Sequence, residues 1–266
     1  ALNYAHEQGV VLVAASGNFG DSAKIYPAAF DVIITVGGSN SIGEVTFFSS
    51  YGSWLDLVAP GRDILSLRAD TSDLYADQGE PDLRIIDEQY YLADGTSMSA
   101  PIVAGVVAEI LAYSPGLPPD RVREILHISA DDIVDPYGNG DNLTGFDVFA
   151  GYGRVNNADA LGLVEGRLAK LYLPGRMMTT GSLDVVATAY SEFDQNYDLY
   201  IYPAGDSSGV APVASGIADK IGDTLVSFNG WNGDGRYIVR LEVGENFDER
   251  EVFYTTGPEL SIIDPE

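Results

Sequence analysis

Three short apolar runs near the start of the chain constrain its fold most strongly. They are Val10–Ala15, Val32–Val36 and Leu55–Ala59, and each ends in a turn-forming group that contains glycine. These runs lack the regular alternation of apolar and polar residues that marks a strand with one face in water. They predict strands that are buried on both faces, which is typical of a parallel sheet covered by helices.

Helical segments precede and follow these runs. The longest, Ser97–Tyr113, is apolar and rich in Ala and Gly, which predicts a buried helix. Shorter helices are expected at Ala1–Gln8, Pro119–His127 and Asn157–Val164. Strands combined with helices in this way predict an α/β domain over residues 1–165, with a parallel sheet that has helices on both faces.

The second part of the chain has a different pattern. From about Gly166 the helical periodicity stops, and short strand-like segments alternate with turn residues. These segments are Leu183–Ala189, Tyr197–Tyr202, Thr224–Phe228, Tyr237–Val243 and Glu251–Tyr254. The spacing predicts an all-β sandwich over residues 166–266. A polar stretch at residues 69–91 is expected to be a surface insertion in the first domain.

The charge of the chain excludes several classes of partner. Lys and Arg number 14 against 40 Asp and Glu, which gives a formal net charge of -26. Such a chain cannot neutralise a phosphate backbone, so we expect no nucleic-acid partner and no binding to anionic membrane surfaces. No apolar run was found to approach the roughly 18 residues that a membrane span needs, so we expect a soluble chain. The absence of Cys removes disulfides, metal thiolates and a thiol nucleophile.

The segment Gly95–Gly105, with the sequence GTSMSAPIVAG, carries the clearest chemical signal. It places Ser97 at the start of the buried helix, beside unpaired N–H donors and the positive end of the helix dipole. Pro101 follows near the start, where its missing N–H costs least. This arrangement suits a nucleophile whose attack creates an oxyanion, although an isolated Ser or Thr there would more often be an ordinary helix cap.

This segment resembles the nucleophile motif of the subtilisin-like serine peptidases, the subtilases, at nine of its eleven positions. Ser99 and Ile102 are the two departures. Other family-like segments follow in the family's order: Ala14–Asn18, Tyr26–Ala28, Phe48–Gly52, Val58–Gly61 and Gly151–Asn156. The resemblance covers most of residues 1–165, and it implies a subtilisin-like domain without its N-terminal part.

The resemblance also implies a role for each matching residue. Ser97 would be the nucleophile, and Asn18 would hold the oxyanion together with the backbone N–H of Ser97. Ala15, Ser16 and Gly17 would form one wall of the pocket for the substrate residue before the cut. No cofactor or metal site is predicted, and a calcium ion is left open with no site assigned.

The family's catalytic Asp and His motifs are absent from this sequence. Its two histidines, His6 and His127, lie outside the family's catalytic positions, and we expect both to be surface or helix-end residues. The chain starts at Ala1 inside an expected helix, so we expect the missing Asp and His in an upstream part of the same catalytic domain, which would be a partner of this piece. The piece alone is predicted to be inactive, because Ser97 has no general base.

Two loops and one tryptophan have less specific signals. The segment Asp135–Phe146 resembles an EF-hand loop, but Tyr137 and Phe146 stand where the loop needs oxygen ligands, so a solvated loop is expected. Gly205–Gly209 is expected to be a turn. Trp231–Leu241 resembles the edge of fibronectin- and immunoglobulin-like modules, and Trp231 is expected in a core or turn role rather than as a glycan platform.

These observations lead to one functional hypothesis and one alternative. The hypothesis is a serine endopeptidase that hydrolyses peptide bonds of protein or peptide substrates through an acyl-enzyme. Its location would be extracellular or at the cell surface. The alternative is a non-catalytic cell-surface binding protein that retains the subtilase fold.

Overall fold

The computed structural model divides the chain into two compact units. Unit 1 comprises Ala1–Leu161 and unit 2 comprises Gly162–Glu266. The structure describes residues 1–68, 84–87, 89–133, 145–173, 176–192, 195–205, 207 and 209–256. The EF-hand-like segment and the polar insertion therefore lie largely outside the described residues.

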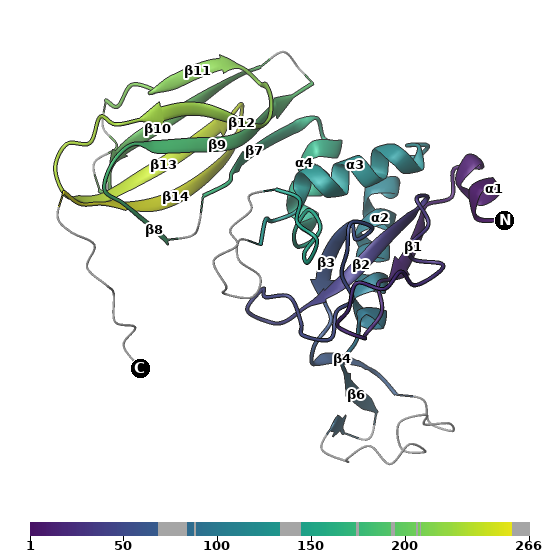
Figure 1. The fold of residues 1–266 in the computed structure, drawn as a ribbon. Helices are drawn as coiled ribbons and strands as arrows, with labels where there is room; N and C mark the ends of the chain where they lie inside the picture. The colour runs from purple at the N-terminus through teal and green to yellow at the C-terminus, as the bar shows by residue number, and fades with distance from the viewer. Residues whose placement is uncertain are drawn as a thin grey trace. The chain divides into compact units, whose positions relative to one another are not determined.

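Unit 1 is built around a parallel sheet of three strands in the order β1-β2-β3 (Figure 1). The strands are β1 (Leu12–Ala15), β2 (Ile33–Ser39) and β3 (Leu57–Pro60). Leu12 pairs with Ile33 and Val36 pairs with Leu57, so the apolar runs become strands in register. Every residue of the central strand β2 is buried, whereas all four residues of the edge strand β1 are partly exposed.

The helix α2 (Thr96–Tyr113) packs across this sheet and contacts all three strands. Its buried side chains include Val103, Val107 and Ile110. Pro101 lies past the first turn, rather than within it as expected, so the Ser97 carbonyl receives no helical N–H from this position. The parallel sheet and its main helix thus match the expected α/β architecture, while the expectation of helices on both faces stays a prediction.

The sequence analysis expected no apolar segment of membrane-spanning length, but α2 is such a segment. This helix has 18 residues with a mean hydropathy of 1.4, so length and composition alone would allow it to cross a membrane. It is the one such helix in the described part of the chain. α2 contacts three strands, as the core helix of an α/β domain does. A core helix can be as long and as apolar as a helix that spans a membrane.

The remaining elements of unit 1 surround the sheet. The helices are α1 (Leu2–Glu7), α3 (Pro119–Ser129) and α4 (Asn157–Val164), the last of which reaches into unit 2. A small antiparallel sheet has the order β4-β6-β5 and comprises β4 (Ile64–Leu67), β6 (Tyr90–Ala93) and β5 (Ile85–Ile86). β4 precedes the polar stretch at residues 69–91, β5 lies within it, and β6 begins at its end and leads into α2.

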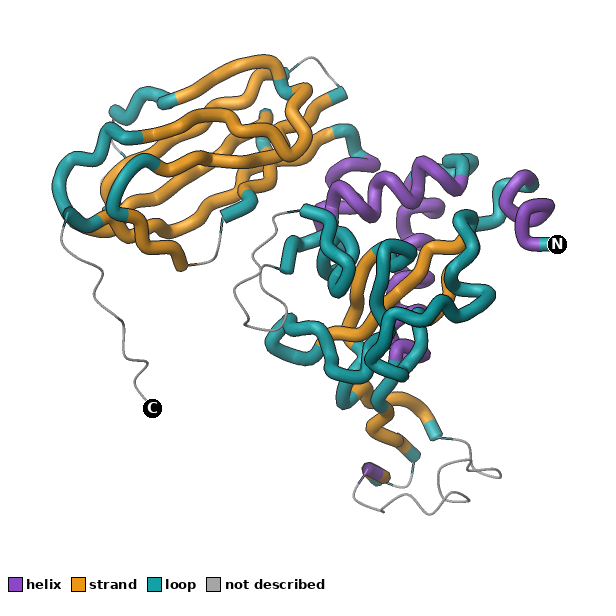
Figure 2. The backbone as a smooth tube through the Cα atoms, in the orientation of Figure 1, coloured by secondary structure: helices purple, strands orange, loops and turns teal. Residues whose placement is uncertain are grey.

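Unit 2 consists of strands in two sheets (Figure 2). One sheet has the order β11-β10-β13-β14-β8 and the other the order β12-β9-β7. Their bounds are β7 (Arg167–Leu171), β8 (Arg176–Thr179), β9 (Leu183–Ser191), β10 (Asn196–Pro203), β11 (Ala214–Ile217), β12 (Asp219–Phe228), β13 (Gly235–Val243) and β14 (Asn246–Tyr254). All pairings are antiparallel except that of β14 with β8.

One hydrophobic core joins the two sheets of unit 2. Val185 and Ala187 of β9 are buried in the same cluster as Leu199 of β10 and Leu241 of β13. Each predicted strand segment lies in an observed strand, but β7, β8 and β11 were not predicted. β7 contains a buried Lys170 in its sequence RLAKL, which hides it from a search for apolar residues.

Trp231 packs against this core from the turn after β12. Its ring stacks on Tyr254 at 4.8 Å and meets the edge of Tyr237 at 4.9 Å. Its Nε1 donates to the Gly181 carbonyl at 2.7 Å. Because its ring and its N–H both have partners within unit 2, the geometry supports the expected core or turn role.

Candidate functional site

Asn18 and Thr96 meet although 78 positions separate them in the sequence. The Asn18 Oδ1 accepts a hydrogen bond from the Thr96 backbone N–H at 2.8 Å and another from the Thr96 hydroxyl at 3.0 Å. The Thr96 hydroxyl accepts in turn from the Gly17 backbone N–H at 3.2 Å. These bonds join the loop after β1 to the first residue of α2, beside Ser97.

The parallel sheet explains this meeting. β1 ends at Ala15, and the Ser16 N–H still bonds to the Val36 carbonyl at 2.9 Å, so the chain leaves β1 alongside the middle of β2. The loop before α2 is fixed by a bond of 2.7 Å from the Gly95 N–H to the Gly61 carbonyl, just beyond β3. The first loop leaves the carboxyl edge of the parallel sheet and the second is bonded to the chain there, and α/β proteins most often place their ligands at this edge.

Gly95 permits the close approach of Asn18. Its backbone has φ 146° and ψ 154°, a region that is nearly restricted to glycine. A Cβ added there would lie 3.2 Å from the Asn18 Nδ2. The glycine of the GTS motif is therefore required both by its own conformation and by the neighbouring amide.

The bonds to Thr96 also fix which way the Asn18 amide faces. Because Oδ1 is occupied by two donors, the Nδ2 group remains to donate elsewhere. Asn18 and Ser97 are both exposed, so substrate has access to them. A hydroxyl beside a fixed N–H donor and a helix N-terminus has the chemistry needed to attack a carbonyl and hold the resulting oxyanion.

The predicted pocket residues lie at the end of β1 and in the loop that follows it. Ala15 and Gly17 are partly buried, and Ser16 is fully buried. The Ser16 side chain therefore has no access to a substrate in this structure, and only its backbone could line a pocket. Their proposed role in substrate binding stays a prediction.

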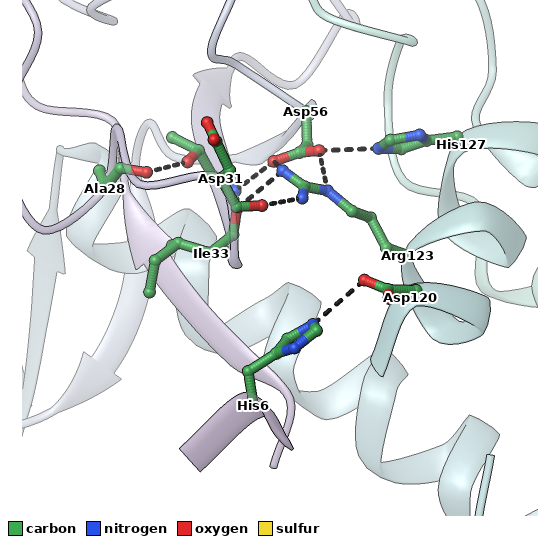
Figure 3. Close-up of polar contacts among 9 residues, drawn as sticks. His6, Ala28, Asp31, Ile33, Asp56, Asp120, Arg123 and His127 are labelled. Carbon is green, nitrogen blue, oxygen red and sulfur yellow. Dashed lines mark hydrogen bonds and ion pairs between the residues drawn. The ribbon is translucent and has the colours of Figure 1, made fainter. Parts of the chain in front are cut away.

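Neither histidine lies at Ser97. His6 Nε2 bonds to Asp120 at 3.1 Å, and His127 Nε2 bonds to Asp56 at 2.8 Å (Figure 3). Both histidines lie in the last turn of a helix, His6 in α1 and His127 in α3, which confirms the expectation of helix-end residues. Their side chains are only 19% exposed, because each contacts an acidic partner. Within the described residues, Ser97 has no side-chain hydrogen-bond partner.

A polar cluster around Asp56 was missed by the sequence analysis. Arg123 of α3 donates from Nε to Asp56 Oδ1 at 2.6 Å and from an Nη to Oδ2 at 2.9 Å. The same guanidinium bonds to the Ile33 carbonyl at 2.9 Å and to the Asp31 carbonyl. An acidic residue inside the apolar run Leu55–Ala59 was the signal that could have revealed it.

Asp56 is ionised in this cluster. Its residue is only 4% exposed, and burial by itself would raise the pKa of the carboxyl. The hydrogen bonds from His127 and Arg123 and the charge of Arg123 outweigh burial and lower the pKa below its ordinary value of 3.8. The Thr35 backbone N–H adds a further bond of 2.7 Å in the same direction.

Comparison with known proteins agrees with the sequence motifs. The model of the subtilase family, Peptidase_S8, matches residues 1–153. The chain belongs to the subtilase family. The resemblance seen in the motifs is thereby confirmed at the level of the family, whose members are serine proteases.

Individual relatives match the same part of this subtilase. It is 34% identical over 161 residues to the thermophilic serine proteinase of Bacillus sp. (strain AK1), which covers 60% of this chain and 33% of that protein. It is 32% identical over 174 residues to the cell wall-associated protease of Bacillus subtilis (strain 168), covering 60% of this chain and 18% of that protein. A crystal structure of a lanthipeptide protease has a TM-score of 0.49 at 25% identity and covers 61% of this chain and 53% of the other. The chain thus spans a third or less of the length of these two curated relatives.

Proposed function

We propose that this chain carries the nucleophile and the oxyanion-binding group of a serine endopeptidase. Ser97 attacks the carbonyl carbon of a peptide bond, and the developing oxyanion receives N–H groups from Asn18 Nδ2 and the Ser97 backbone. The observation that carries this proposal is the pair of bonds from Thr96 to Asn18 Oδ1, which leaves Nδ2 free to donate beside Ser97. An acyl-enzyme forms on Ser97, and water then releases it.

The proton transfers require a base that the described residues do not place at Ser97. We assign this role to a histidine and an aspartate from the rest of the parent protein's catalytic domain, as the family resemblance implies. Without them, only the smaller rate enhancement from binding and oxyanion stabilisation would remain. The activity proposed here therefore belongs to the parent protein, and the 266-residue chain alone is expected to be inactive.

Two further features are part of the proposal. Unit 2 is an accessory β-sandwich that acts beside the catalytic domain as a spacer, a stabiliser or a substrate-docking unit. The protein is extracellular or attached to the cell surface. The acidic chain, the resemblance of Trp231–Leu241 to extracellular modules and the relative named as cell wall-associated support these two points.

The test uses the parent protein with three single variants. Ser97→Ala should abolish hydrolysis of casein, and Asn18→Ala should lower kcat by about 10²–10³ with little change in KM, because the lost donor acts mainly on the transition state. Removal of the oxyanion-hole asparagine of subtilisin, a member of the same family, has an effect of this size. Ser53→Ala is the matched control, since Ser53 is an exposed serine of the same unit on the loop before the amino end of β3.

A second readout separates the two hypotheses. A fluorophosphonate probe forms a bond to an activated serine oxygen and loses fluoride, so it should label Ser97 in the parent protein. Labelling at Ser97 with hydrolysis would support the peptidase. Absence of both in a folded parent protein would overturn it and favour the non-catalytic binding protein.

A further inference from the structure

The five-stranded sheet of unit 2 turns one face away from the core (Figure 1). Side chains along a strand alternate between the two faces of a sheet. Leu199 and Ile201 of β10 are buried in the core. The alternate residues of β10 therefore lie on the outer face, and all three are partly exposed: Asp198, Tyr200 and Tyr202.

The neighbouring strands β13 and β14 continue this outer face. On β13 the residues on this side include Arg240 and Glu242. Arg240 lies opposite Tyr200 of β10 and also opposite Glu249 of β14. Phe247 of β14 lies opposite Glu242 and is 56% exposed. The outer face thus combines aromatic rings with carboxylates.

Two like charges stand directly opposite each other on this face. Asp198 of β10 pairs in register with Glu242 of β13, a placement that is unfavourable without a compensating charge. Each carboxylate uses one oxygen: Asp198 Oδ1 accepts from the Ser215 hydroxyl at 2.5 Å, and Glu242 Oε1 accepts from Arg240 at 2.6 Å. Among the described residues, Asp198 Oδ2 and Glu242 Oε2 have no hydrogen-bond partner, so each can accept from a ligand of its own.

Negative charge predominates on the outer face as a whole. The acidic and basic residues on β10, β13 and β14 are Asp198, Glu242, Glu249 and Glu251 against Arg236 and Arg240. Arg240 is paired with Glu242 and Glu249, and Arg236 is paired with Glu251 at 3.1 Å. Because both guanidinium groups are paired, the face attracts a cation rather than an anion.

The aromatic rings offer a basic side chain a second kind of contact. A cation is attracted to the face of an aromatic ring, and the Arg240 guanidinium already lies 4.0 Å from the centre of the Phe247 ring. In the described part of the chain, Tyr200 has no cation on its ring and no hydrogen bond to its hydroxyl. Burial, followed by the charges of Asp198 and Glu242, raises the pKa of Tyr200, so both carboxylates act on this ring.

We propose that the outer face around Asp198, Tyr200, Tyr202, Glu242 and Phe247 docks a basic segment of a protein substrate. Separate Lys or Arg side chains of the segment bind Asp198 Oδ2 and Glu242 Oε2, and one of them lies over the Tyr200 ring. Charge complementarity selects this occupant, because the face repels acidic segments. The inference rests on the proposed function, and it assigns to unit 2 the docking role among the three roles named above.

Binding is measured with the 266-residue chain and therefore does not require hydrolysis. The probe is a fluorescein-labelled peptide of four Lys-Ser repeats, followed by fluorescence anisotropy. A peptide in which Gln replaces every Lys should bind at least about tenfold more weakly, because it lacks the charges that pair with the face.

A matched pair of double variants separates the outer face from the overall charge of the chain. Asp198→Asn combined with Glu242→Gln removes two charges from the face and should weaken binding by about tenfold. Asp184→Asn combined with Asp223→Asn removes the same charge from exposed residues of the other sheet and should weaken it by less than about twofold. Tyr200→Ser should weaken binding by about two- to fivefold, whereas Tyr200→Phe, which keeps the ring, should not.

The parent protein provides the second readout. A casein with the Lys-Ser segment fused to it should have a lower KM than plain casein at an unchanged kcat. The variant Asp198→Asn with Glu242→Gln should abolish this difference and leave plain casein hydrolysis as it is.

These outcomes judge the two proposals separately. Equal weakening by the two double variants, equal binding of the Gln peptide, or no effect of Tyr200→Ser overturns the docking face. If the double variant on the face fails to fold in a thermal melt, the comparison of Tyr200→Ser with Tyr200→Phe decides. Loss of docking with casein hydrolysis intact overturns this inference alone, whereas absence of all hydrolysis overturns the proposed function, even where the peptide binds.

Discussion

Removal of the Arg123 side chain should destabilise unit 1 strongly. In Arg123→Met, the Asp56 carboxylate stays buried but loses its bonds of 2.6 and 2.9 Å to the guanidinium. The carbonyls of Asp31 and Ile33 lose their donors as well. Breaking a buried ion pair by removing one partner costs about 3–5 kcal/mol. Because Thr35 and His127 still donate to Asp56, we expect about 3 kcal/mol, at the lower end of this range.

Urea unfolding followed by tryptophan fluorescence measures this loss, in a Trp231→Phe background so that Trp54 of unit 1 gives the signal. With a slope of about 1–3 kcal/mol per molar urea, the midpoint should fall by about 1 M or more. The control is Arg62→Met, which removes an arginine that is 47% exposed and only 3.8 Å from Asp63. An exposed pair of this kind contributes below about 1 kcal/mol. Equal midpoints for Arg123→Met and Arg62→Met would refute the argument that the Asp56 cluster ties α3 to the sheet.

Three further predictions concern the contact between Asn18 and Thr96 and the cluster around Asp56. Thr96→Val should lower kcat of the parent protein by about tenfold, because one hydrogen bond that orients Asn18 is lost, and Thr96→Ser should restore most of it in steady-state kinetics. Gly95→Ala should cost about 1–3 kcal/mol in a thermal melt from backbone strain and should also displace the Asn18 amide. Asp56 has a lowered pKa, so its stabilising effect is present above pH 3.8 and is lost as the pH falls through the folded-state value. The difference in unfolding free energy between wild type and Asp56→Asn should therefore shrink on acidification below pH 3.8, and a constant difference would contradict this.

Local sequence signals predicted the parts of the fold that depend on neighbouring residues. The three apolar runs became β1, β2 and β3, and the Ala- and Gly-rich segment became α2. The strand β7 escaped prediction because Lys170 interrupts its apolar residues, and β11 because its sequence, ASGI, holds only one large apolar residue. Their places in the sheets are decided by pairing with distant strands, as for β11 with β10.

The candidate catalytic residues could be predicted from local sequence, whereas the cluster around Asp56 could not. Ser97 and Asn18 lie in motifs that continuous sequence segments make visible. Asp56, Arg123 and His127 lie in no motif, because the nearest of the two α3 residues is 67 positions from Asp56. Such a cluster is formed only when α3 packs at the amino ends of the strands, so a single sequence cannot show it.

The candidate catalytic site and the Asp56 cluster also differ in their electrostatics, and this difference has a consequence for mechanism. The groups that hold Asn18 are neutral: the hydroxyl and N–H of Thr96 and the N–H of Gly17. Neutral dipoles fixed beside Ser97 stabilise an oxyanion when charge develops, without needing a counter-ion in the ground state. These groups do not titrate near neutral pH. The pH dependence of hydrolysis should therefore report the base that activates Ser97, and the Asn18→Ala variant should lower kcat without moving the pH profile.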